Sequence, residues 1–187
     1  AAWYFAPDGH VYQNLRHGFS SEDLAAHAGR KGKARGGNGT LEVTWATGKK
    51  TSAKLSRDGT GFGWDAGLFT PVEAYGNAAE VVGAYEGGES LAGASERAAV
   101  AKRMELRADG TFTWNGVSFL TTASRATEIS AGSTAGSQGR WELSGFSLIL
   151  TGDNGTVFRG IVFPYDDAKT PAKPDRMFFG GLMYKKR

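Results

Sequence analysis

The stretch that decides the fold is Trp3-Tyr4-Phe5-Ala6-Pro7-Asp8-Gly9-His10-Val11-Tyr12, which has the pattern of a strand, a tight turn and a second strand. Proline presets the φ angle at its position and glycine supplies a positive φ, so Pro7-Asp8-Gly9 predicts a hairpin turn. The same pattern returns as Met104-Glu105-Leu106-Arg107-Ala108-Asp109-Gly110-Thr111-Phe112-Thr113-Trp114. The chain therefore carries one β-hairpin pattern twice.

Two glycines follow each hairpin at the same spacing. They are Gly32 and Gly48 after the first hairpin and Gly139 and Gly155 after the second, 16 residues apart in both cases. An apolar strand pattern precedes the later glycine in each copy, at residues 41–45 and 148–151. A shared order with identical spacing indicates the duplication of one β-rich unit. We expect a single domain over residues 1–187 that contains two similar halves, about 1–76 and 77–187.

The composition favours an all-β fold with many tight turns. The 187 residues include 28 glycines and five tryptophans, and 12% of the residues are aromatic. We predict an antiparallel meander of two similar halves, with ten to twelve strands in one barrel or sandwich. One short helix is expected near residues 20–28, where Ser20 and Asp23 match a capping box and Gly29 can end the helix. The later strands are expected at 40–46, 50–57, 61–70, 139–144, 146–151, 156–164 and 176–185.

The bulk properties exclude several classes of site and suggest a location. The chain has no cysteine, which excludes disulfides, thiolate metal sites and cysteine nucleophiles. A formal net charge of +3 is too small to indicate nucleic acid binding by itself. The chain begins Ala1-Ala2-Trp3 without methionine, as a mature end left by signal-peptide cleavage or a truncated end does, and we favour cleavage. The predicted location is therefore periplasmic or secreted, with no transmembrane segment.

Two short motifs resemble a known family of barrels. Gly83-Ala84-Tyr85 and Gly139-Arg140-Trp141 each open a strand with Gly-x-aromatic, and hairpins with Asp-Gly turns follow. This combination resembles the lipocalin and calycin β-barrels. The resemblance implies a barrel with a cavity for a small apolar ligand, and it implies that Tyr85 and Trp141 are structural residues at the closed barrel end.

Candidate catalytic groups are few. His10, His17 and His27 all lie in the first 27 residues, but their spacing matches no standard metal pattern and Thr111 replaces His10 in the second copy. Two carboxylate pairs could act as acids, namely Glu86 with Glu89 and Asp166 with Asp167. We interpret all of these as surface or loop residues. The sequence also has no Gly-x-Ser-x-Gly nucleophile motif, so we expect no catalytic residues, no metal site, no cofactor and no enzyme activity.

Two groups of residues are the predicted ligand or partner contacts. The first is Trp64 with Phe62, because the glycines around Trp64 are expected to leave its ring uncovered. The second group consists of Arg30, Lys31, Lys33 and Arg35, in a glycine-rich basic loop predicted over residues 29–39. This loop lacks the Gly-Lys-Ser/Thr of a phosphate-binding loop. It also lacks the interleaved aromatics of single-strand binding, so a nucleic acid partner is not expected.

The sequence leaves two functional hypotheses. The first is a non-catalytic accessory or structural subunit of a larger extracytoplasmic assembly, which acts through protein–protein contacts. The alternative is a lipocalin-like binding module for a small apolar or glycan ligand. Because no catalytic constellation stands out and the cavity depends on the resemblance, the accessory role is the principal prediction.

Overall fold

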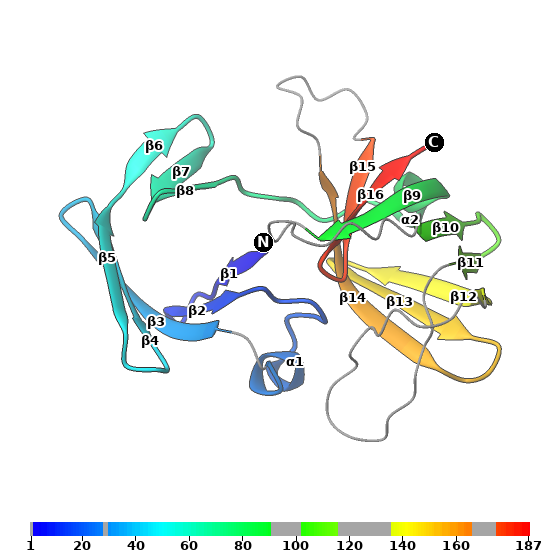
Figure 1. The fold of residues 1–187 in the computed structure, drawn as a ribbon, viewed down its shortest axis with the longest axis horizontal. Helices are drawn as coiled ribbons and strands as arrows, with labels where there is room; N and C mark the ends of the chain where they lie inside the picture. The colour runs from blue at the N-terminus through cyan, green and yellow to red at the C-terminus, as the bar shows by residue number, and fades with distance from the viewer. Residues whose placement is uncertain (1, 28–29, 91–101, 116–135, 166–174) are drawn as a thin grey trace. The chain divides into compact units, whose positions relative to one another are not determined.

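A computed structural model describes residues 2–27, 30–90, 102–115, 136–165 and 175–187. The chain divides into two compact units, Ala1–Val72 and Glu73–Arg187. We call them the first unit and the second unit and describe each by itself. Both are built almost entirely of strands, so the predicted all-β class is confirmed (Figure 1).

The first unit contains two antiparallel sheets. Its five-stranded sheet has the order β1-β2-β3-β4-β5, and its three-stranded sheet has the order β6-β7-β8. The elements in chain order are β1 (Trp3–Phe5), β2 (His10–Gln13), α1 (Ser21–Ala25), β3 (Arg30–Gly37), β4 (Thr40–Trp45), β5 (Lys50–Lys54), β6 (Ser56–Asp58), β7 (Gly61–Trp64) and β8 (Gly67–Phe69). Each strand pairs with its neighbours in the chain, as in a meander.

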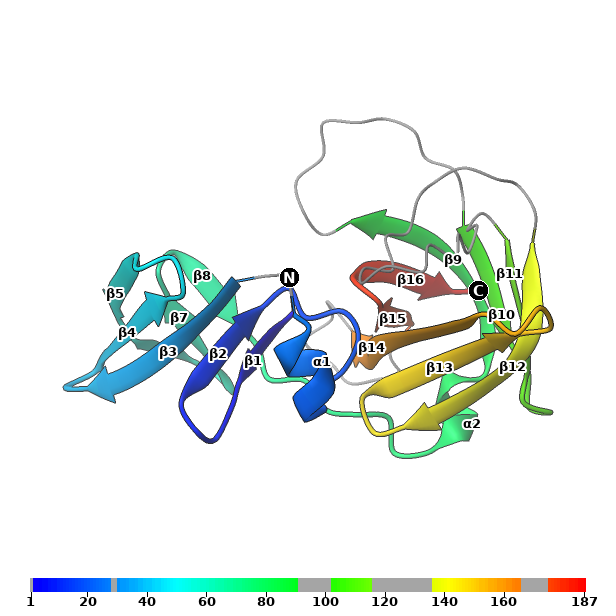
Figure 2. The ribbon, with the colours of Figure 1, turned by 90° about the horizontal axis from the view of Figure 1, so that it is seen from below.

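The second unit is a closed antiparallel barrel of eight strands, in which the last strand pairs with the first (Figures 1 and 2). Its elements are α2 (Ala78–Val81), β9 (Gly83–Ser90), β10 (Lys102–Leu106), β11 (Thr111–Asn115), β12 (Ser137–Ser144), β13 (Ser147–Gly152), β14 (Val157–Tyr165), β15 (Arg176–Phe179) and β16 (Leu182–Lys186). A closed barrel, one of the two predicted architectures, is therefore present, but the strands of the second unit form it without those of the first.

Apolar side chains that point inward form one buried cluster in the barrel. Phe158 lies against Trp114 and Phe179, with ring centroids 5.4 and 5.3 Å away, and both contacts are edge-on. Tyr85 and Trp141 are buried in the same cluster. Their polar atoms are satisfied by backbone carbonyls, because the Tyr85 hydroxyl donates to Val81 at 2.8 Å and the Trp141 indole donates to Arg107 at 3.0 Å.

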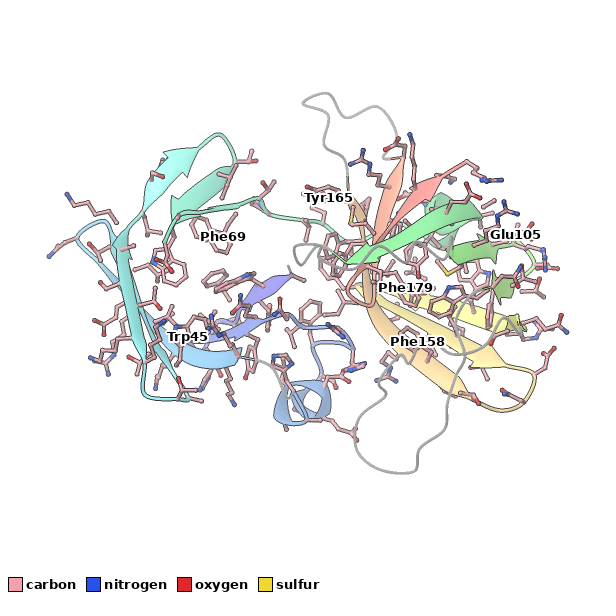
Figure 3. All side chains as sticks on the ribbon, in the orientation of Figure 1. Trp45, Phe69, Glu105, Phe158, Tyr165 and Phe179 are labelled. Atoms are coloured by element: carbon pink, nitrogen blue, oxygen red, sulfur yellow. The ribbon has the colours of Figure 1, made fainter. Side chains whose placement is uncertain are left out.

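The core of the first unit is smaller. Val11, Val43, Trp45 and Trp64 are buried there, from strands of both sheets. Trp64 ties the two sheets together, since its indole nitrogen donates to the carbonyl of Leu41 at 2.9 Å. Figure 3 shows Trp45 and Phe69 turned toward the interior of this unit.

The short helix forms where its capping signal predicts it. The Ser20 hydroxyl accepts from the backbone of Asp23, and the Asp23 carboxylate accepts from the backbone of Ser20, which is the reciprocal bonding of a capping box. The helix α1 is nevertheless shorter than predicted. A second helix, α2, was not predicted; Asn77 caps it by accepting from the backbone of Ala79.

Several strand predictions are wrong in detail. The described residues contain sixteen strands rather than ten to twelve, because the expected strand at 61–70 turns back at Asp65 and Ala66, which both have positive φ. The expected strand at 176–185 likewise turns at Gly180 and Gly181. A third strand, expected at 50–57, divides into β5 and β6. Residues 91–101 and 116–135 lie outside the described residues, as does the predicted acidic pair Asp166 and Asp167.

Candidate partner-binding surface

The two units share one pattern of backbone hydrogen bonds. In the first unit the backbone amide of Ala34 donates to the carbonyl of Gly9 at 2.8 Å. In the second unit the equivalent bond runs from Trp141 to Gly110, also at 2.8 Å. The turn bond from Gly48 to Trp45, 2.8 Å long, likewise returns as a 2.8 Å bond from Gly155 to Gly152. The sequence repeat therefore has a counterpart in the backbone.

Strand register extends this correspondence to the end of each unit. Trp3 pairs with Gln13 as Met104 pairs with Trp114. Phe62 pairs with Phe69 as Met177 pairs with Tyr184. The strands correspond in order: β1 with β10, β2 with β11, β3 with β12, β4 with β13, β5 and β6 with β14, β7 with β15, and β8 with β16. No strand in the described part of the first unit corresponds to β9.

In the second unit, β9 is the strand that closes the barrel, since it pairs with β10 on one side and with β16 on the other. Among the described residues, no such strand lies between the corresponding edges of the first unit. Among the described strands, β1 pairs with β2 alone and β8 pairs with β7 alone. We call these two unpaired edges, β1 and β8, the seam.

Aromatic side chains from both edges meet at the seam. The Trp3 ring lies edge-on to Phe69, with centroids 5.1 Å apart. Phe62 stacks on Phe69 at 4.9 Å with an interplanar angle of 8°. Phe5 completes the group by lying edge-on to Phe62 at 5.7 Å. Side-chain packing thus joins two edges between which no backbone hydrogen bond is described.

The seam residues are more exposed than their counterparts in the closed barrel. Leu106 is 1% exposed, whereas Phe5 at the same repeat position is 36% exposed. Trp3, Phe62 and Phe69 are half-buried, although their counterparts Met104, Met177 and Tyr184 are buried. Burial away from the seam differs at some positions only. Val11 and Trp64 are as buried as Phe112 and Phe179, whereas Leu55 is 40% exposed and its counterpart Val162 is buried. Part of the difference in burial therefore lies where β9 has no described counterpart.

The predicted contact Trp64 is covered. Its side chain is 3% exposed, so the expectation that the neighbouring glycines leave the ring open is wrong. Packing against Trp3 and Phe69 explains the burial, with ring centroids 6.0 and 6.2 Å away. Phe62, predicted with it, belongs to the half-buried seam group. A contact of either residue with a ligand stays a prediction.

The four predicted basic residues lie on a strand, not in a flexible loop, because residues 30–37 form β3. Side chains alternate between the two faces of a strand, so Lys31, Lys33 and Arg35 share the outer face. Arg30 faces the other way, with its guanidinium 5.7 Å from the centroid of the Trp45 ring. The structure thus brings together three of the four residues.

Two further cations extend this outer face. Lys33 lies opposite Thr44 in the sheet, and Thr44 lies opposite Lys50. The side chain of Lys50 on β5 is therefore on the same face of the sheet as that of Lys33 on β3. Lys54 lies on the same face of β5. We call Lys31, Lys33, Arg35, Lys50 and Lys54 the basic face. Sequence reasoning missed the two residues of β5, although the alternation of Lys50, Ser52 and Lys54 is a signal for one polar strand face.

The basic face is specific to the first unit. Its five positions correspond to Gln138, Arg140, Glu142, Val157 and Ile161 in the second unit. Among the described strands β2 to β5, Glu42 is the one acidic residue on that face, and it pairs with Lys50 at 3.4 Å. The first unit has nine Lys and Arg against six Asp and Glu, whereas the second unit has 13 of each. The net charge of the chain therefore resides in the first unit.

Two of the three histidines, and Glu86 among the candidate acidic residues, make local contacts. The His10 backbone amide donates to the Asp8 carboxylate, and the His10 ring lies 2.9 Å from it; these two contacts lower the pKa of Asp8. His27 contacts the carbonyl of Gln13 at 3.1 Å, and burial lowers its pKa. Glu86 forms ion pairs with Arg103 at 2.8 Å and with Arg187. No group of three metal-ligating side chains occurs among the described residues.

Comparison of the chain with protein-family models, with curated proteins and with solved structures finds no match in any of the three. The closed eight-stranded barrel of the second unit is compatible with a lipocalin-like fold. Within the described ranges, neither short helix has the length and apolarity needed to cross a membrane.

Proposed function

We propose that the protein is a non-catalytic accessory subunit of an extracytoplasmic assembly and that it binds a partner protein through its first unit. The observation that carries this proposal is the difference in burial between equivalent apolar positions of the two units. The apolar positions that the closed barrel of the second unit buries are partly exposed along the seam of the first unit. Exposed apolar side chains flanked by polar residues are typical of protein contact sites.

The exposed apolar residues and the positive charge of the basic face both support the first unit as the contact region. Of the five large apolar side chains that are exposed in the described chain, four belong to the first unit, namely Phe5, Leu55, Leu68 and Val72. The basic face adds a field that would attract an acidic partner surface, because clustered charges of one sign raise the rate of encounter with the opposite sign. The lack of cysteine suits an exported protein, although it does not require one.

The alternative, a lipocalin-like module with a ligand in the barrel, has weaker support. A ligand cavity needs open space lined by apolar side chains. The interior of the second unit instead holds large side chains, including Trp114, Phe158 and Phe179, that contact one another. This packing favours a scaffold role for the barrel.

Site-specific crosslinking in the source organism tests the proposal. A photo-reactive phenylalanine analogue replaces Leu68 in the first unit or Val157 in the second, two apolar residues that are 65% and 56% exposed. We expect the probe at Leu68 to capture a discrete protein and the probe at Val157 to capture none. Capture at both positions, or at Val157 alone, would contradict a contact region in the first unit.

A further inference from the structure

The second unit shows how the seam can be completed. There β9 runs antiparallel to both of its neighbours, and its Tyr85 lies opposite Met104 on one side and Lys186 on the other. The side chain of Tyr85 is buried in the barrel core. In the first unit the corresponding flanking positions are Trp3 and Pro71. A strand placed in the same register would therefore set an inward side chain on the half-buried seam aromatics.

We propose that the seam accepts one extended strand of the partner protein, antiparallel to both β1 and β8, with an aromatic residue at the inward position of Tyr85. This inference rests on the proposed function and specifies the partner segment. Unpaired sheet edges present free backbone donors and acceptors, and an added strand satisfies them while its alternate side chains fill the apolar site. The occupant is thus a polypeptide segment, recognised largely through its backbone.

The form of β9 also indicates which residues the partner strand carries. Gly87 has a φ of +134°, and a Cβ atom there would lie 2.7 Å from the carbonyl oxygen of Met183. At the position of Met183 the first unit has Leu68, on the seam edge. We therefore expect a glycine two residues after the inward aromatic residue, because a close approach of two backbones requires one.

In the partner strand, the outward residue between the inward aromatic residue and the glycine should be uncharged. In β9 this residue is Glu86, which pairs with Arg103 and Arg187. Their counterparts at the seam are Ala2 and Val72. A carboxylate would find no cation at either position, so a neutral residue fits the seam better than the glutamate of β9.

A peptide with the sequence of residues 82–90 is the probe, and the full-length protein is the receptor. Because the chain has no cysteine, one can be introduced at a chosen place. In β9, Glu86 lies opposite Lys185, and the counterpart of Lys185 at the seam is Thr70. The peptide carries Glu86→Cys, activated as a mixed disulfide with thionitrobenzoate, and thiol exchange with the protein releases the coloured thiol.

The matched protein variants are Thr70→Cys and Lys185→Cys, two exposed positions that are equivalent in the repeat. We expect the peptide to label Thr70→Cys at least tenfold faster than Lys185→Cys, whose place beside β9 is already occupied. A second pair of protein variants, Tyr4→Cys and Glu105→Cys, tests the β1 edge of the seam in the same way. The peptide then carries Ala84→Cys, because Ala84 lies opposite Glu105 in the barrel. A Tyr85→Ser change in the peptide should lower the rate at both seam positions at least tenfold.

Equal labelling of the two positions in each pair would overturn the strand proposal, as would labelling that is insensitive to Tyr85→Ser. The outcome is separable from that of the proposed function. Protein capture at Leu68 without selective peptide labelling would mean that a partner binds the first unit in another way. Selective labelling without capture would mean that the seam accepts a strand but that the accessory role is wrong.

Discussion

The indole of Trp3 and the ring of Phe69 meet edge-on, with centroids 5.1 Å apart and planes at 87°. They belong to β1 and β8, two strand edges with no described hydrogen bond between them. Edge-to-face aromatic pairs are worth about 1 kcal/mol beyond the area that they bury. Side-chain packing of this kind can hold two sheets in one unit while their backbone edges stay unpaired.

The first prediction compares equivalent positions of the two units. We expect Leu106→Ala to lower the free energy of unfolding of the second unit by about 3 kcal/mol, because that side chain is fully buried. Phe5→Ala should cost the first unit only about 1 kcal/mol, because its ring is already partly in water. Denaturant unfolding monitored by tryptophan fluorescence measures both changes. A loss at Phe5 as large as that at Leu106 would mean that the seam is closed in solution.

A second prediction concerns strand glycines. A Cβ atom on Gly139 would overlap the carbonyl oxygen of Thr151 on the neighbouring strand, and the backbone there cannot move without breaking the ladder. We expect Gly139→Ala to destabilise the second unit by about 3 kcal/mol or more, as overpacking against fixed atoms does. Gly36→Ala is the control, because a Cβ there would meet nothing within 4 Å. Thermal unfolding should show a large loss for the first variant and a change near zero for the second.

Alkaline pH should destabilise the second unit. Burial raises the pKa of Tyr85 from 10.0 to about 12, and it also raises those of Tyr75 and Tyr184. Between pH 10 and pH 12 the tyrosine of the unfolded chain ionises while that of the folded chain stays neutral. The free energy of unfolding is therefore unaffected below pH 10 and falls as the pH rises toward 12. For Tyr85 the loss of stability reached by pH 11 is about 1 kcal/mol. Urea unfolding at pH 8 and pH 11 measures it, and Tyr85→Phe should reduce the difference.

The basic face gives a fourth prediction. Lys33 and Arg140 are equivalent in the repeat, and both are exposed. If the first unit attracts an acidic partner, Lys33→Glu should lower the crosslinking yield at Leu68 about threefold to tenfold at low salt, and added salt should reduce the difference. Arg140→Glu should leave the yield unchanged. An equal effect of both substitutions would point to the net charge of the chain and not to the basic face.

Sequence reasoning predicted the elements whose signals are local. The Asp-Gly hairpins depend on glycine at positive φ, and Gly9 and Gly110 have φ angles of 84° and 79°. The helix α1 depends on the capping box of Ser20 and Asp23. The turn between β7 and β8 was missed because it places Asp65 and Ala66, which are not the usual turn glycine, at positive φ.

The candidate site was harder to predict, because it depends on pairing between strands. Glycines and cations in residues 29–39 suggested a loop, yet the register of β3 against β4 makes them one strand of a sheet. The role of Lys50 appears only when β5 is placed beside β4. Nor can the sequence alone show which aromatic residues an unpaired strand edge leaves exposed, because that depends on how the strands pair.

Barrel closure has a consequence for the order of folding. In the second unit β9 must find β16, and Tyr85 pairs with Lys186 across most of that unit's length, which is a costly loop to close. Every described strand pairing in the first unit joins neighbours along the chain. Units with short-range pairings generally form faster than those that await a distant one. We therefore expect the first unit to fold early, with the edges of β1 and β8 already formed, before β9 pairs with β16 in the barrel.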